Sequence, residues 1–325
     1  MTFRAIPWHV LFSWLVVAVN SLAASYDGDG SLPEGVQAYS LGGEALRSPP
    51  PDRDALEKLN TARIAYEKDP TNADNIIWYG RRTAYAGEYR SAIRVFSEGI
   101  ERHPGDPRMY RHRGHRYISV REFDRAIKDL EYAATLMDGR DNSIEPDGMP
   151  NALNIPVSTL HGNIWYHLGL ARYLKQDWEE AYRAFQAGFD TGGNDDNRVS
   201  TAHWRYMILR RMGKTAEAER TLDDIGTDMN VIENMVYHRL CLFYKGEVSL
   251  AEMTAEDADS PTGAAGAYGV ANWFLYNGDV AEAKQRMEAL TSTPGWDSFG
   301  HIAAEADLAM LAREASGAAS SPTNR

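Results

Sequence analysis

Apolar and polar residues follow a helical period along most of this chain, and between residues 73 and 140 the same pattern occurs twice. In 73–86 and again in 107–120, large apolar residues surround one glycine with polar residues between them, which predicts a helix. After a short break, apolar residues resume at spacings of three to four and predict a second, amphipathic helix. Such a helix pair cannot bury both of its faces alone, so it must stack on copies of itself.

The repeated residues alternate small and large side chains in the same order in each unit. They are Gly80, Tyr89, Ala92, Phe96 and Pro104, and 34 residues later Gly114, Phe123, Ala126, Leu130 and Asp138. A third unit contains Gly162, Trp165, Leu168, Gly169, Trp178, Ala181 and Phe185. The small residues let two antiparallel helices approach closely, and the aromatic residues fill the space around their contact.

This 34-residue pattern resembles the tetratricopeptide repeat (TPR) family, whose unit has small residues at its eighth and twentieth positions and a proline near its thirty-second. The resemblance implies an all-α fold, a right-handed superhelical solenoid of stacked antiparallel helix pairs. It also implies peptide binding, and it implies no catalytic activity. We expect a signal peptide at 1–23, a Gly/Pro-rich linker at 24–53, a capping helix at 54–72, two clear TPR units at 73–140, an inserted loop at 141–161, further TPR and degenerate helix pairs at 162–297, a C-terminal capping helix at 298–316 and a disordered tail at 317–325.

The N-terminal stretch differs from the rest of the chain. Arg4 precedes an apolar run at 10–19, and small residues around Ala23 suit cleavage there, as in a secretory signal peptide. The alternative is an uncleaved N-terminal anchor, because only one charge precedes the run. We expect a periplasmic or secreted protein with no membrane span after cleavage. The lone Cys241 lies in an apolar stretch, which predicts a buried core thiol and no intramolecular disulfide.

Two segments outside the repeats each allow two interpretations. Residues 26–52 are either a linker or a strip that lies back across the repeats as an intramolecular ligand or cap. The 139–161 insertion is long enough to be a structured surface or binding loop. Its neighbourhood contains Asp138, Asp141, Glu145 and Asp147, which leaves calcium open although their spacing does not follow an EF-hand loop.

In TPR-like arrays the first helix of each pair lines the concave side, so residues projecting from these helices are the candidate partner-binding residues. They are Trp78, Arg81, Tyr85, Arg108, Arg111, His112, His115, Asn163, Tyr166, His167, His203, Trp204 and Arg210. The chain is acidic, with a formal net charge of −12, yet this set is basic and aromatic. Arginine forks match carboxylates, and Trp and Tyr give stiff apolar contact. The set therefore favours a peptide or protein segment with acidic groups or a C-terminal carboxylate, although its charges could also only solvate a helix face.

The histidines raise a second hypothesis. His112 and His115 share a helix face, with His167 and His203 across the groove, so the groove could instead bind a small anion or a metal ion, together with the 139–161 loop. With an ordinary pKa, these histidines would make the groove more positive in mild acid. No metal-ligand motif accompanies them, so we assign no metal site and expect no cofactor.

No catalytic motif occurs, so we assign no catalytic residues and expect no enzyme. The acidic composition also argues against nucleic acid as a partner. The sequence thus favours a non-catalytic scaffold or adaptor of the cell envelope that binds a peptide or protein partner, while self-association through a solenoid end stays open.

Overall fold

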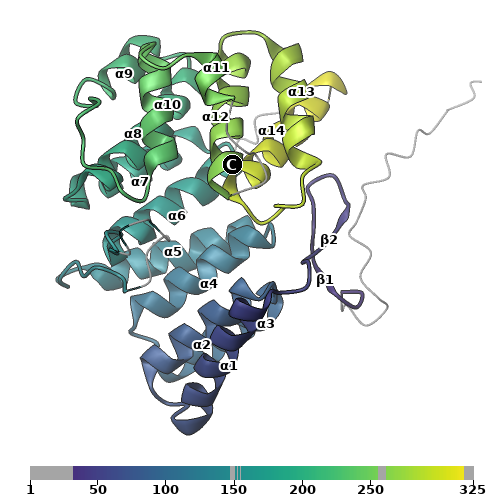
Figure 1. Ribbon diagram of the computed structural model, residues 1–325, viewed down its shortest axis with the longest axis vertical. Helices are drawn as coiled ribbons and strands as arrows, with labels where there is room; N and C mark the ends of the chain where they lie inside the picture. The colour runs from purple at the N-terminus through teal and green to yellow at the C-terminus, as the bar shows by residue number, and fades with distance from the viewer. Residues whose placement is uncertain (1–31, 147–150, 152, 154, 255–260, 318–325) are drawn as a thin grey trace, which may run out of the picture.

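The computed structural model describes residues 32–146, 151, 153, 155–254 and 261–317. The expected signal peptide and the tail beyond residue 317 lie outside these residues. Within them the protein has fourteen helices and one two-stranded sheet. The predicted all-α fold of stacked antiparallel helix pairs is confirmed (Figure 1).

Successive helices from α2 to α13 pack as antiparallel pairs, preceded by α1 and followed by α14. The helices are α1 Arg53–Lys68, α2 Ala73–Tyr85, α3 Tyr89–Arg102, α4 Pro107–Ser119, α5 Phe123–Met137, α6 Leu160–Leu174, α7 Trp178–Thr191, α8 Asp195–Arg211, α9 Thr215–Arg220, α10 Met235–Lys245, α11 Leu250–Met253, α12 Pro261–Tyr276, α13 Val280–Thr291 and α14 Phe299–Ala315. Asn72, Asp106 and Thr159 cap α2, α4 and α6 by accepting hydrogen bonds from backbone amides of the first turn. The first helix of each of these pairs therefore starts at a position that the local sequence fixes.

The repeated glycine is required by the close contact inside each pair. A Cβ atom at this position would lie within 2.6–2.8 Å of a large side chain of the partner helix. The pairs are Gly80 with Phe96, Gly114 with Leu130, and Gly169 with Phe185. The glycine and the large apolar residue of the repeat are thus two halves of one contact.

The turn inside each pair places one residue in the left-handed backbone region. The residues with this conformation are Gly87, Arg121, Gln176, Gly213, Gly246 and Gly278. Arg121, with a φ of 64°, therefore occupies a position that is glycine in most units. A side chain at such a position costs about 1–2 kcal/mol, so its presence calls for a compensating interaction.

Part of the expected linker forms a β-hairpin instead. Strands β1 Val36–Tyr39 and β2 Ala45–Arg47 pair in antiparallel register, and Ala38 is fully buried in the main core. Gln37 accepts a hydrogen bond from the backbone amide of Arg90 on α3. The sequence predicts a linker or a strip across the repeats at 26–52 and no strand, because the segment is short and rich in glycine and proline. It becomes ordered through its contacts with other parts of the fold.

The last helix turns toward the concave side of the stack. Besides packing on α12 and α13, α14 contacts α6 and lies near the hairpin side of the molecule (Figure 1). Trp296, just before α14, donates from its indole to the carbonyl of Arg47 at 2.9 Å and packs edge-on against Tyr89. The helix that the sequence predicts as the cap of the stack therefore packs on the last helix pair and also reaches α6 and the hairpin side.

One contiguous core runs from the hairpin through the first three helix pairs to α14. A second cluster fills the space among α8 to α12, and it includes Cys241, whose thiol is buried as predicted. None of the helices in the described part of the chain is long and apolar enough to cross a bilayer.

Replacing Gly169 by alanine tests the close contact. The new Cβ would lie 2.7 Å from the Phe185 ring, which cannot withdraw because it stacks on Trp204 with centroids 5.6 Å apart. We expect a loss of about 1–3 kcal/mol in the free energy of unfolding, typical of overpacking. Urea unfolding followed by circular dichroism measures this. Gly105→Ala is the control, since no atom lies within 4 Å of a Cβ there, and it should leave the midpoint unchanged. Equal midpoints for both variants would contradict the contact's role.

Candidate ligand-binding cavity

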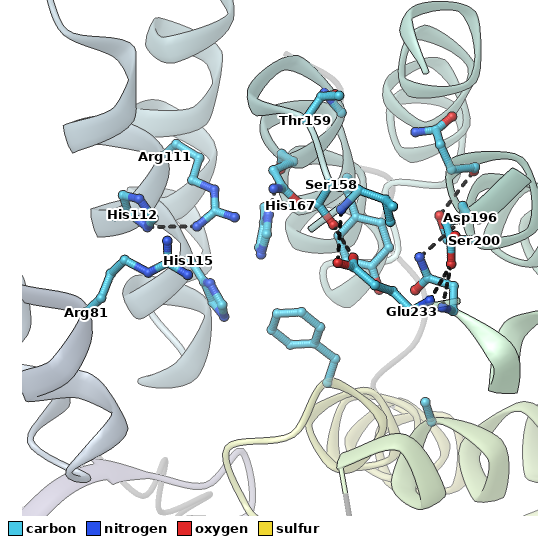
Figure 2. A pocket seen from close by; sticks show the side chains of 18 of the residues that line it. Arg81, Arg111, His112, His115, Ser158, Thr159, His167, Asp196, Ser200 and Glu233 are labelled. Atoms are coloured by element: carbon cyan, nitrogen blue, oxygen red, sulfur yellow. Dashed lines mark hydrogen bonds between the residues drawn. The ribbon is translucent and has the colours of Figure 1, made fainter. Parts of the chain in front are cut away.

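The concave faces of α2, α4, α6 and α8 surround a cavity of about 560 Å³, which the start of α14 partly closes. This volume lies within the roughly 300–1,000 Å³ of typical small-ligand pockets. Figure 2 shows arginine and histidine side chains on one side of the cavity and the carboxylates Asp196 and Glu233 on the other. The cavity therefore has a cationic end and an acidic end.

The structure brings eight of the thirteen candidate residues together around this cavity. They are Arg81, Tyr85, Arg111, His112, His115, Asn163, Tyr166 and His167. All eight come from the first helices of the first three pairs. The remaining five are Trp78, Arg108, His203, Trp204 and Arg210, and none of them lines the cavity.

His203 and Trp204 lie in the core. The Trp204 ring is 2% exposed, stacks on Phe185 and donates from its indole nitrogen to the Tyr166 hydroxyl at 3.2 Å. His203 is 1% exposed and accepts or donates a hydrogen bond with Tyr244. Both residues support the cavity wall from behind and do not reach the cavity itself.

The other three are engaged elsewhere. Arg108 forms ion pairs with Asp74 and Asp106, both with a 2.6 Å contact. Trp78 lies against the guanidinium groups of Arg81 and Arg82, 5.2 and 5.1 Å from its ring centroid. Arg210 donates to Asn277 at 2.6 Å near the α12–α13 turn. Their positive charge and aromatic surface therefore contribute to the fold outside the cavity.

The cationic end is assembled mainly by α4. Arg111, His112, His115 and Arg116 all line the cavity, and His167 of α6 lies against His115 with ring centroids 4.4 Å apart. Burial and the charges of neighbouring arginines hold the pKa of His112, His115 and His167 well below the usual range. The expected rise in positive charge in mild acid requires an ordinary histidine pKa, so the lowered pKa of these three residues argues against it. The permanent charges of this end are arginines.

The inserted loop contributes a carboxylate to this end. Glu145 pairs with the Arg111 guanidinium at 2.8 Å and also accepts a hydrogen bond from the Asn163 side chain. The segment is held by an isolated bridge between Ile144 and Thr159. Glu145 therefore neutralises Arg111, and Asp147, another acidic residue of the calcium alternative, lies outside the described residues. Among the described residues, no group of three or more His, Cys, Asp or Glu is arranged to hold a metal ion.

The acidic end is built by the segment before α10. Asp196 accepts hydrogen bonds from the backbone amides of Ile232, Glu233 and Asn234, the last two at 2.7 Å, so it holds this segment in place. Glu233 in turn accepts from the Val157 amide at 3.2 Å and from the Ser158 hydroxyl at 2.6 Å. Its carboxylate therefore ties the end of the inserted loop to the cavity wall.

The start of α14 closes the cavity. Phe299 packs on His115 and His167, with ring centroids 5.1 and 5.6 Å apart. Asp297, just before it, accepts a hydrogen bond from the Tyr89 hydroxyl at 2.8 Å. The concave surface that would be an open groove in a straight array is thus a partly enclosed cavity.

A buried ion pair holds this closure. The Arg121 guanidinium forms two contacts with Glu305 of α14, and also donates to the carbonyls of Ser119 at 2.6 Å and Trp296 at 2.8 Å. Glu305 further accepts from the Leu41 amide at the hairpin tip. This latch, Arg121 with Glu305, explains why the glycine position of the second turn contains an arginine.

Sequence reasoning missed the residues that only tertiary folding brings to the site. Arg116 lies one turn beyond His112 on the same helix face, so helical spacing could have indicated it. Glu233 and Phe299 come from segments that lie far from the clear repeats, and no local pattern marks them. The closure of the array, which brings Phe299 to the cavity, is not visible in the repeat pattern.

The fold is therefore a stack of TPR-type helix pairs around a partly enclosed cavity. No protein-family model matches the chain. The chain is 24% identical over 160 residues to the small glutamine-rich tetratricopeptide repeat-containing protein 2 of Saccharomyces cerevisiae, covering 49% of this chain and 40% of that protein. The matched region thus spans less than half of that relative.

Solved structures with a similar arrangement of helices have low sequence identity. YrrB, described as a TPR protein with an unusual peptide-binding site, is 15% identical, with 78% of this chain and 97% of that chain covered and a TM-score of 0.39. A tetratricopeptide repeat protein from Parabacteroides merdae is 14% identical, with coverages of 79% and 93% and a TM-score of 0.44. A chain of the APC/C hetero-tetramer Cut9–Hcn1 is 14% identical, with 77% of this chain and 40% of that chain covered and a TM-score of 0.46. TPR proteins generally use their concave surfaces to bind protein partners.

Replacing Arg121 by glycine separates its backbone conformation from its ion pair. The change relieves about 1–2 kcal/mol of backbone strain but leaves Glu305 buried without its partner, which costs about 3–5 kcal/mol. We therefore expect a net loss of about 1–4 kcal/mol in the free energy of unfolding, measured by urea unfolding. Gln176→Gly is the matched control, because Gln176 has the same left-handed conformation, with a φ of 63°, and no ion pair. It should not lower stability, and equal losses in both variants would refute the latch.

Acid should weaken the latch. Burial raises the pKa of Glu305, but the hydrogen bond with His301 and the charge of Arg121 outweigh it and lower the pKa below its usual value. A carboxyl group whose pKa is lower in the folded than in the unfolded protein stabilises the fold. This contribution is fully present above the pKa of the unfolded state, about 4.3, and is lost as the pH falls through the pKa of the folded state. Glu305→Gln should thus lower the unfolding midpoint at pH 7, and the gap to wild type should narrow below about pH 4.3. Glu131→Gln, which removes a half-exposed carboxylate, is the control. A gap that does not change with pH would contradict the assignment.

Proposed function

We propose that this protein is a non-catalytic interaction scaffold that holds a short peptide segment of a partner protein in the cavity on its concave side. The observation that carries the proposal is the cavity itself, about 560 Å³ in volume and lined by arginine, histidine and aromatic side chains from three successive helix pairs. Its size suits a few residues of extended chain. An α-helix, about 10–12 Å wide with its side chains, is too bulky for it.

The lining has the chemistry of a peptide site. Arginine at the cationic end matches carboxylates of the ligand, and Tyr166, Tyr237 and Phe299 offer aromatic surface for apolar side chains. The two tyrosine hydroxyls share a hydrogen bond of 2.7 Å, which fixes both rings. A rigid, preformed wall of this kind reduces the entropy lost on binding.

The proposal also places the protein in the cell envelope. This part is supported by the sequence, in which a single Arg4 precedes an apolar run at 10–19 and small residues near Ala23. Mass spectrometry of the protein from its native host tests it. A mature N-terminus near residue 24 is the expected result, and an intact N-terminus in the cytosolic fraction would refute export.

Filling the cavity should abolish peptide binding. Ser200 lines the cavity, and Ser200→Phe would occupy part of its space. We expect a library of random hexapeptides with free carboxyl ends, panned on the immobilised full-length protein, to yield acidic sequences. Retention of these peptides should fall at least tenfold on Ser200→Phe, because the phenylalanine ring and the peptide would compete for the same space.

Two further variants make this test decisive. Thr135→Phe places the same ring on the exposed face of α5 and should bind like wild type. Tyr85→Glu changes a half-exposed cavity residue, so it should fold normally while the new carboxylate weakens binding of acidic peptides. Equal retention on all four proteins, or no enrichment on wild type, would refute the proposal.

A further inference from the structure

Two buried charges of opposite sign line the cavity without an ion-pair partner. Arg116 is 8% exposed, and its guanidinium forms no hydrogen bond or ion pair with any residue in the described part of the chain. Its contact is with the Tyr89 ring, 5.7 Å from the centroid. Glu233 is 5% exposed and has no cationic partner among the described residues, although two neutral donors bind its carboxylate.

These two residues differ from the other buried charges nearby. Arg111 pairs with Glu145, Arg121 pairs with Glu305, and Asp196 is satisfied by several backbone amides. An uncompensated buried charge is costly to a fold, and Arg116 cannot lose its proton at physiological pH. A counter-charge supplied from the cavity would remove this cost at both residues.

We propose that the ligand of the cavity is zwitterionic: a short peptide whose free carboxylate pairs with Arg116 and whose ammonium group pairs with Glu233. This inference rests on the proposed peptide-binding function and specifies which part of a peptide the cavity recognises. A carboxylate opposite Arg116 forms a charge-assisted, bidentate contact, and an ammonium group donates to the remaining lone pairs of Glu233.

The surroundings of Arg116 suit an anion. Arg81 and Arg111 lie at the same end, and their charges act on Arg116 or on the histidines beside it. The N-terminus of α14 also faces the cavity through Ser298, whose side chain does not cap the helix. Asp297 opposes an anion here, because its carboxylate, which accepts the Tyr89 hydroxyl, keeps its negative charge and acts on Arg116 without forming an ion pair with it.

The surroundings of Glu233 suit a cation. Asp196 adds a second carboxylate, and Ser200 and Asn234 add neutral polar groups to the same wall. Figure 2 shows Glu233, Asp196 and Ser200 together on the side opposite Arg81 and His112. The cavity thus offers opposite charge to the two ends of one ligand.

Four forms of one peptide test this inference. They are tetra-alanine with free ends, its N-acetyl form, its C-terminal amide, and the form with both ends blocked. Isothermal titration calorimetry on the full-length protein should show that either block weakens binding at least tenfold, since each removes one charge-assisted contact. The doubly blocked peptide should bind more weakly than either singly blocked form.

Two variants assign each end of the ligand. Arg116→Met should become indifferent to the C-terminal amide while it still discriminates against the acetyl form. Glu233→Gln should show the reverse. The controls Arg113→Met and Glu131→Gln remove charges that are paired outside the cavity, with Asp129 and Arg172, and should discriminate like wild type. Unfolding midpoints verify that every variant folds, and Arg116→Gln replaces Arg116→Met if the latter does not.

Each outcome decides the inference. Equal affinity for all four forms, or no binding of any form to wild type, overturns it. The proposed function survives these results if the hexapeptide library still selects peptides that Ser200→Phe excludes. A longer peptide with both ends blocked, and with acidic and basic side chains, provides the last comparison. If it binds tightly to wild type and loses this binding in Arg116→Met and Glu233→Gln, the two charges recognise an internal segment of a protein. That result would overturn the recognition of free peptide ends.

Discussion

Arg121 and Glu305 form a buried ion pair between residues that lie 184 positions apart in the chain, and the shape of the whole concave side depends on it. An ion pair in the interior loses much of its Coulombic gain to desolvation unless further hydrogen bonds satisfy both groups. Here the carbonyls of Ser119 and Trp296 and the amide of Leu41 supply those bonds. The pair therefore joins the second helix pair, the β-hairpin and α14 at one point.

Closure of the array changes the chemistry of the residues inside it. In an open groove, Arg116 and Glu233 would be hydrated and their charges screened by water. In the closed form both are almost wholly removed from solvent, and the pKa of the groove histidines falls because burial disfavours their charged form. A second buried pair, Arg211 with Asp307, fixes α14 to the end of α8. By excluding water from the concave surface, α14 makes the electrostatic effect of each single charge in the cavity stronger.

The helix pairs could be predicted from the sequence because their determinants are local. Gly169 and Phe185 lie 16 residues apart in the same unit, and their contact recurs wherever the pattern recurs. The cationic end of the cavity could be predicted for the same reason, since α4 presents its residues at helical spacing. The acidic end and the closure by Phe299 could not be predicted, because Glu233 and Phe299 reach the cavity only through the curvature of the entire array. Trp204 was misplaced because its unit packs against α10 and α12, which bury it.

In the proposed ligand site, the unpaired charge at each end of the partly enclosed cavity determines how selectively a ligand binds. Specificity is a difference between affinities, and it is greatest where the wrong ligand leaves a buried group unpaired. An anion alone would satisfy Arg116 and leave Glu233 uncompensated, and an apolar segment would satisfy neither. Because both charges are fixed before binding, the ligand does not have to order them, and the free energy of each new contact contributes to affinity. The arrangement therefore favours a ligand that satisfies both ends over one that satisfies a single end.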